Sequence, residues 1–114
     1  MAESYEREKL SAAVNCLAAS AAPIQKRIEY AWMAMHTLKN HGFTNQDRAS
    51  DYEEIYERLT ADKSDAQAGH VPTTCSRLSD DEAAEIAQMI VDLNSRLHMD
   101  RMYQLEDQLR ANGK

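Results

Sequence analysis

The chain has 114 residues, which is enough for one domain with one modest hydrophobic core. Its 43% hydrophobic and 28% charged residues are typical of a soluble globular protein, and three Gly with two Pro are too few turn residues for a many-stranded sheet. The net charge of −6 argues against direct binding of nucleic acid through its phosphates. We therefore expect an all-α protein.

The N-terminal region does not have the charge pattern of a secretory signal. Residues 11–22 are small and apolar, but the segment before them carries three glutamates, whereas a signal peptide begins with positive charge. No run reaches the roughly 18 apolar residues that a membrane span needs. The two cysteines, Cys16 and Cys75, do not make a disulfide framework. A single bridge between them is possible on number alone, but we expect reduced thiols in a cytoplasmic protein.

Two helices are predicted in the first part of the chain. The first runs from Ser4, its expected cap, to about Ser20, and the second begins at Pro23, whose fixed φ suits a first helical turn. His41 and Gly42 would give the second helix a cationic last turn and a left-handed stop. The apolar positions repeat at helical spacing, and they are Leu10, Val14, Leu17 and Ala21, then Ile24, Ile28, Ala31, Met35 and Leu38.

A shorter third helix is predicted from Thr44, its expected cap, to about Asp62. Its buried face consists of Tyr52, Ile55 and Leu59. Residues 61–78 have no hydrophobic period and contain Gly69 and Pro72. Connections of this length without secondary structure are uncommon in compact domains, and they are either mobile linkers or functional loops. We expect a flexible loop over about 61–78.

The last helix has the clearest pattern in the chain. Ser79 and Glu82 have the spacing of a capping box. The positions expected to face the core are Ala83, Ile86, Ile90, Leu93 and Leu97. Continuing that stripe would bury Asp100, and the apolar residues after it have a different phase. Because no Pro or Gly forces a break, we expect one helix that continues to about Ala111, with a break near His98 as the alternative.

The main candidate for a functional surface is an apolar stripe that consists of Met99, Met102, Tyr103, Leu105 and Leu109. Methionine-rich helical surfaces adapt to partners, and exposed apolar patches mark association. Two interpretations stay open. Either the helix bends so that the stripe covers the first or second helix of the same chain, or the stripe binds another molecule. A second copy is the expected partner, because symmetric dimers are the commonest oligomers.

A second candidate is the acidic face of the predicted third helix, which contains Asp51, Glu53, Glu54 and Glu57. Residues 43–66 carry seven acids and three bases, a net charge of −4, and only Glu54 and Arg58 form a favourable i,i+4 pair. Such a face is either a solvated surface or a contact for a basic partner, in the manner of a protein that imitates a nucleic-acid backbone.

No pattern predicts a catalytic residue, a metal ion or a cofactor. His36 and His41 are five residues apart, and neither a C-x-x-C nor an H-x-x-x-H motif is present. Cys75 follows His70 by five residues, but a cysteine nucleophile also needs a base within hydrogen-bond reach and a third group that orients the base. We therefore expect that the protein is not an enzyme.

Two short segments resemble those of short uncharacterised bacterial helical proteins. They are Glu8-Lys9-Leu10 with Ala12-Ala13-Val14, and Leu78-Ser79-Asp80-Asp81-Glu82-Ala83 with Glu85-Ile86-Ala87. The resemblance covers about 40 residues. It implies a helical fold and brings no activity and no functional residue with it.

Together these patterns predict a single all-α domain over residues 1–114. We expect a bundle of four helices, or five if the last one breaks, with a long loop before the last helix. The predicted function is that of a non-catalytic protein-protein interaction module, which forms a homodimer or binds another protein through the C-terminal stripe. The alternative is a small acidic inhibitor, such as a phage-type antagonist, that blocks a basic nucleic-acid-binding surface.

Overall fold

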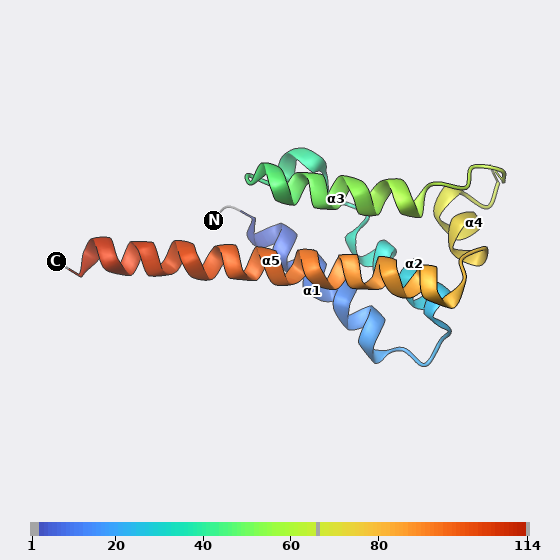
Figure 1. Ribbon diagram of the computed structural model, residues 1–114, viewed down its shortest axis with the longest axis horizontal. Coiled ribbons are helices and arrows are strands. Elements are labelled where there is room, and N and C mark those ends of the chain that lie inside the picture. The colour runs from blue at the N-terminus through green and yellow to red at the C-terminus, as the bar shows by residue number, and fades with distance from the viewer. Residues whose placement is uncertain (1–2, 66, 114) are drawn as a thin grey trace.

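The computed structural model describes residues 3–65 and 67–113, and within them it contains five α-helices, one 3₁₀ turn and no strand (Figure 1). The all-α class is therefore confirmed. In chain order the elements are α1 (Ser4–Ala19), α2 (Ile24–Met35), the 3₁₀ turn η1 (Asn40–Gly42), α3 (Gln46–Leu59), α4 (His70–Ser76) and α5 (Asp80–Asn112).

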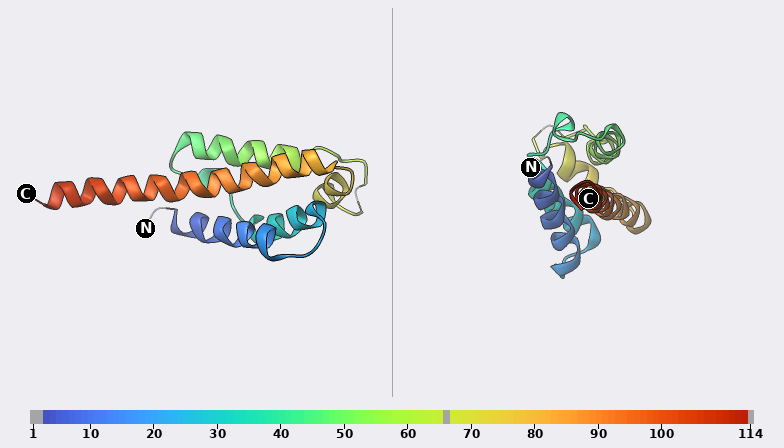
Figure 2. Two further views of the ribbon diagram at one scale, coloured as in Figure 1. Left: turned by 60° about the horizontal axis from the view of Figure 1, so that its bottom comes forward. Right: turned by 90° about the vertical axis from the view of Figure 1, so that its left-hand side faces the viewer.

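Helix α5 is the element around which the others pack. It contacts α1, α2 and α3, and Figure 2 shows it running between the α1–α2 pair and α3. The predicted core stripe of α5 is confirmed, since all five of its residues are at most 1% exposed. These five residues are Ala83, Ile86, Ile90, Leu93 and Leu97. One continuous hydrophobic cluster joins this stripe to the buried faces of the other four helices.

The start and end of α5 agree with the sequence analysis. The Ser79 hydroxyl accepts the backbone N–H of Glu82 at 3.1 Å, and the Glu82 carboxylate accepts the backbone N–H of Ser79 at 2.9 Å, which confirms the capping box. The helix continues without a break through His98 to Asn112. The continuous helix expected to about Ala111 is therefore confirmed.

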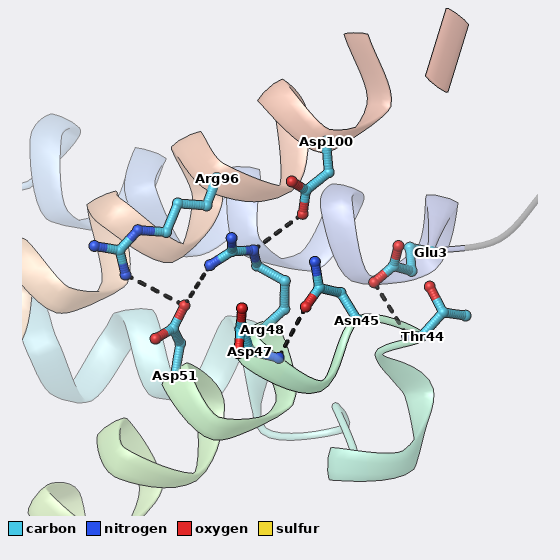
Figure 3. Close-up of polar contacts among 8 residues, drawn as sticks. All are labelled: Glu3, Thr44, Asn45, Asp47, Arg48, Asp51, Arg96 and Asp100. Carbon is cyan, nitrogen blue, oxygen red and sulfur yellow. Dashed lines mark hydrogen bonds and ion pairs between the residues drawn. The ribbon is translucent and has the colours of Figure 1, made fainter. Parts of the chain in front are cut away.

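The predicted cap of α1 was wrong. Ser4 is the first helical residue, and Glu3 precedes the helix with a φ of 65°. The side chain of Glu3 is buried, and its carboxylate accepts the backbone N–H of Thr44 at 3.3 Å (Figure 3). At the other end of the helix, Arg27 donates to the backbone carbonyl of Leu17 at 3.0 Å, so that a cation closes the negative end of α1.

The predicted end of α2 was also wrong. The helix stops at Met35, and the chain then turns through η1, where the φ of Gly42 is not positive. A Cβ at Gly42 would lie 2.5 Å from a carboxylate oxygen of Glu6 on α1, so a larger residue here would displace the end of that flexible side chain. Leu38 is nevertheless buried as expected, and its backbone carbonyl accepts the hydroxyl of Tyr52 at 2.8 Å.

Helix α3 begins one residue later than predicted. Asn45, rather than Thr44, is its cap, because the Asn45 side chain accepts the backbone N–H of Asp47 at 2.8 Å. The predicted stripe of α3 is buried, as Tyr52, Ile55 and Leu59 are at most 5% exposed.

The segment 61–78 is not a structureless loop. It contains the short helix α4, which packs against α2 and α3 and buries Val71, Thr73, Thr74 and Cys75. The hydroxyl of Thr74 accepts the backbone N–H of Asp62 at 2.9 Å, which ties the start of the segment to the helix. The flexible loop expected here therefore has a helix in its second half. Ala66, within the same range, lies outside the described residues.

Candidate protein-binding surface

The last part of α5 extends beyond the other helices (Figures 1 and 2). Every residue from 102 to 113 is exposed, and we call this range the C-terminal arm. Its helical part is about 16 Å long at 1.5 Å per residue. Met102, Leu105 and Leu109 are 58%, 40% and 72% exposed, and their spacing of three and four places them on one face. We call these three residues the arm face.

The other two residues of the predicted stripe, Met99 and Tyr103, are also exposed, at 49% and 56%. They are four residues apart, and they lie about 100° around the helix from the arm face. The five residues therefore form two adjacent faces rather than one. None of them is covered by α1 or α2, so the interpretation in which the helix bends and buries the stripe within the same chain was wrong.

An ion network marks the base of the arm on the side of α3. Arg48 donates to the carboxylate of Asp100 at 3.0 Å and to that of Asp51 at 2.8 Å, and Arg96 donates to Asp51 at 3.2 Å (Figure 3). Burial disfavours the charged form of Arg48, but the hydrogen bonds with Asp100 and Asp51 outweigh it and raise the pKa of the guanidinium. The start of α3 is thereby tied to α5 just before the arm.

Polar contacts with α1 lie on a second side of α5. The hydroxyl of Ser11 lies 3.3 Å from the side-chain oxygen of Asn94 and 3.1 Å from Nε2 of His98. Asn94 and His98 are one helical turn apart on α5. The middle of α1, at Ser11, therefore packs against α5 one helical turn before the arm, and Figure 1 shows the arm extending past the N-terminal end of α1.

The predicted acidic face on α3 is only partly available to a partner. Asp51 is occupied by two arginines, and Glu53 is half-buried, whereas Glu54 and Glu57 are exposed. The expected pair between Glu54 and Arg58 was wrong. Arg58 instead donates to Glu85 on α5 at 2.7 Å, so the charge of α3 is used in part to hold the bundle together.

A groove between α2, α3 and α4 was not predicted from the sequence. Its volume is about 530 Å³, and its lining includes Trp32 and Tyr56, whose ring centroids are 5.7 Å apart. Residues 69–72 at the start of α4 also line the groove, and Figure 1 shows α4 at the end of the bundle opposite to the arm. It was missed because α4 was not predicted. Pro72, three residues after Gly69, was the available signal, since proline is favoured in a first helical turn.

The two cysteines differ in burial within the part of the chain that the structure covers. Cys16 and Cys75 are both free thiols, and Cys75 is buried in α4. Burial raises the pKa of Cys75 to about 11, which keeps its thiol protonated and a poor nucleophile at neutral pH. Among the described residues, no group of three or more His, Cys, Asp or Glu could hold a metal ion.

Comparisons of this chain with protein-family models, curated proteins and solved structures found no match. Of the helices described, none is both long and apolar enough to cross a membrane. The resemblance to short bacterial helical proteins therefore stays an expectation from the sequence. The arm face and the acidic face of α3 are the two predicted surfaces whose chemistry we consider as that of a partner-binding site.

Proposed function

We propose that this protein is a non-catalytic interaction module that binds a second copy of itself through the C-terminal arm. The proposal rests on the arm face, in which three large apolar side chains are exposed on the part of α5 that extends beyond the bundle. Full burial of a side chain of this kind gains roughly 1.5–3 kcal/mol. A complex in which a partner covers the arm face would therefore be stabilised by burial of apolar surface that is exposed to water in the single chain.

The charge of the arm supports a second copy as the partner. Residues 102–113 contain two acids, Glu106 and Asp107, and one base, Arg110, which gives a net charge of −1, compared with −6 for the whole chain. Contact between two arms therefore brings little like charge together, whereas contact between two α3 faces would bring much more. The arm is also held in helical form by its continuity with the buried part of α5, which reduces the entropy lost on binding.

The test is the solution mass of the protein over a wide range of concentrations, measured by sedimentation equilibrium. We expect wild type to approach twice its 12.9 kDa monomer mass as concentration rises. A variant with Met102→Glu and Leu105→Glu should stay monomeric, because each dimer would bury charged carboxylates on the arm face. Its circular dichroism and melting temperature should match those of the wild-type monomer, because neither side chain is part of the core.

The matched control is a variant with Gln104→Glu and Gln108→Glu. It makes the same change in charge on the same arm, but both positions lie outside the arm face. We expect this control to dimerise with nearly the affinity of wild type. A wild-type protein that is monomeric at every concentration, or a control as impaired as the first variant, would contradict the proposal.

A second candidate function is that of an acidic inhibitor of a basic nucleic-acid-binding surface, with α3 as the contact. Support for it comes from the exposure of Glu54 and Glu57 and from the net charge of −4 over residues 43–66. We rank it second because Asp51 already binds Arg48 and Arg96 of the same chain.

Salt dependence distinguishes the two candidates. Binding through α3 should weaken steeply as salt increases, and it should be reduced by a variant with Glu54→Gln and Glu57→Gln. Association through the arm face should change little with salt and should be unaffected by that variant. The measurement is dimer affinity for wild type and variant at low and high salt, together with retention on a polycationic resin.

A further inference from the structure

We propose that the two arms pair in antiparallel orientation, so that the tip of each arm points toward the bundle of the other copy. This inference rests on the self-association proposed above and specifies its geometry. The position of the arm face relative to α1 carries it.

The arm face continues the side of α5 that α1 covers. His98, which contacts Ser11 of α1, is four residues before Met102. The intervals from His98 through Met102 and Leu105 to Leu109 are four, three and four, which keeps all of them on one side of the helix. The arm face is therefore the part of that side that lies beyond the end of α1.

This position restricts the direction from which a second helix can arrive. In a parallel pair, the helix of the second copy would run alongside α5 from the bundle outward, through the space that α1 occupies beside Asn94 and His98. The two bundles would also lie at the same end of the pair. In an antiparallel pair, the second arm arrives from the free end, and the two bundles lie far apart.

The pattern of the arm also suits an antiparallel pair. Met102, Leu105, Leu109 and Asn112 are separated by three, four and three residues, so the pattern is the same in both directions along the helix. A two-fold axis midway between Leu105 and Leu109 would place Leu105 of each copy beside Leu109 of the other copy. The two leucine pairs would then be identical, as the two-fold symmetry of a homodimer requires.

A parallel pair has one feature in its favour. In heptad register it would bring Arg101 close to Glu106 of the second copy. Exposed ion pairs of this kind contribute little to association, whereas overlap with α1 would prevent close packing of the arm face. We therefore favour the antiparallel arrangement.

Pulsed electron-spin distance measurement on the full chain tests the orientation. A nitroxide is attached at Ser95→Cys, an exposed position on α5, in a background with Cys16→Ser and Cys75→Ala. Antiparallel arms would separate the two labelled positions by about 36 Å along the helix axis, because each lies 12 residues from the two-fold axis at 1.5 Å per residue. Parallel arms would place them at the same level, with helix axes about 10 Å apart.

The outcomes separate this inference from the proposed function. A long distance that disappears in a Leu109→Glu variant of the labelled protein supports the antiparallel arms. A short distance overturns the orientation but leaves self-association in place. A long distance that persists in the Leu109→Glu variant shows a contact that does not use the arms and overturns both proposals, as does the absence of any dimer.

Discussion

Arg48 on α3 and Asp100 on α5 form an ion pair of 3.0 Å whose side chains are only 17% and 23% exposed. Asp100 is half-buried by this contact with α3. The exposed arm begins two residues later, at Met102. The pair therefore lies at the boundary between the part of α5 that belongs to the bundle and the part that leaves it.

We expect Arg48→Met to lower the free energy of unfolding by about 1–2 kcal/mol, a value between those of exposed and buried ion pairs. The reason is that Asp100 and Asp51 would both lose their shared partner. Urea denaturation of the monomer measures the change. Arg96→Met is the control, since Arg96 is 50% exposed and should cost well under 1 kcal/mol. Equal effects of the two variants would show that the position of Arg48 is not special.

Leucines at two positions of α5 should differ strongly in their effect on stability. Leu93 is fully buried, and Leu93→Ala should cost roughly 2–5 kcal/mol. Leu109 is 72% exposed, and Leu109→Ala should change the stability of the monomer by less than about 0.5 kcal/mol. Denaturation is measured at a concentration below that at which association begins. A large loss for Leu109→Ala would place the arm in the core and contradict the proposed function.

The capping box should make stability depend on pH in the acidic range. The hydrogen bond from the Ser79 backbone N–H lowers the pKa of Glu82 below its ordinary value of 4.5. The ionised carboxylate therefore stabilises the fold above pH 4.5, and this contribution is lost as pH falls through the lower pKa of the folded state. We expect Glu82→Gln to lose less stability than wild type between neutral pH and about pH 3. Identical slopes of unfolding free energy against pH would contradict this.

A buried hydroxyl in α4 should be a site of easy stabilisation. Within the described residues, the Thr73 Oγ is the one buried side-chain oxygen or nitrogen without a hydrogen-bond partner. Thr73→Val keeps the shape and removes the polar group, so we expect the free energy of unfolding to rise by roughly 1 kcal/mol. Thr74→Val is the matched control. It should destabilise, because the Thr74 hydroxyl accepts the backbone N–H of Asp62. Thermal and urea denaturation of both variants measure the contrast.

The parts of the fold that were predicted correctly depend on local patterns. The limits of α5 follow from a capping box and a long apolar period, which need no knowledge of other helices. Helix α4 has only seven residues, too few to show a period, and it is held by contacts with α2 and α3. Leu10 and Val14 were predicted on the same apolar face, but Leu10 is fully buried and Val14 only half-buried, because the position of α1 across α5 decides which side of α1 is covered.

The candidate site was predictable in its residues but not in its shape. The apolar character of Met102, Leu105 and Leu109 is visible in the sequence. Their exposure depends on where α1 and α3 end along α5, which no local pattern contains. The same limit applies to the acidic face. Glu54 was expected to pair with Arg58, but a carboxylate from a distant part of the chain, that of Glu85, takes that arginine.

The uninterrupted course of α5 has a consequence for how its two halves are related. Leu97 is its last buried side chain, and Met102 begins the arm five residues later on the same rigid rod. Each helical residue advances by about 100° of rotation and 1.5 Å of length. One extra residue between these two positions would leave the contacts of the core stripe in place. It would rotate the arm face by about a quarter turn around the axis of α5. The number of residues between the core stripe and the arm thus sets the direction, around the axis of α5, in which the leucines of the arm face point.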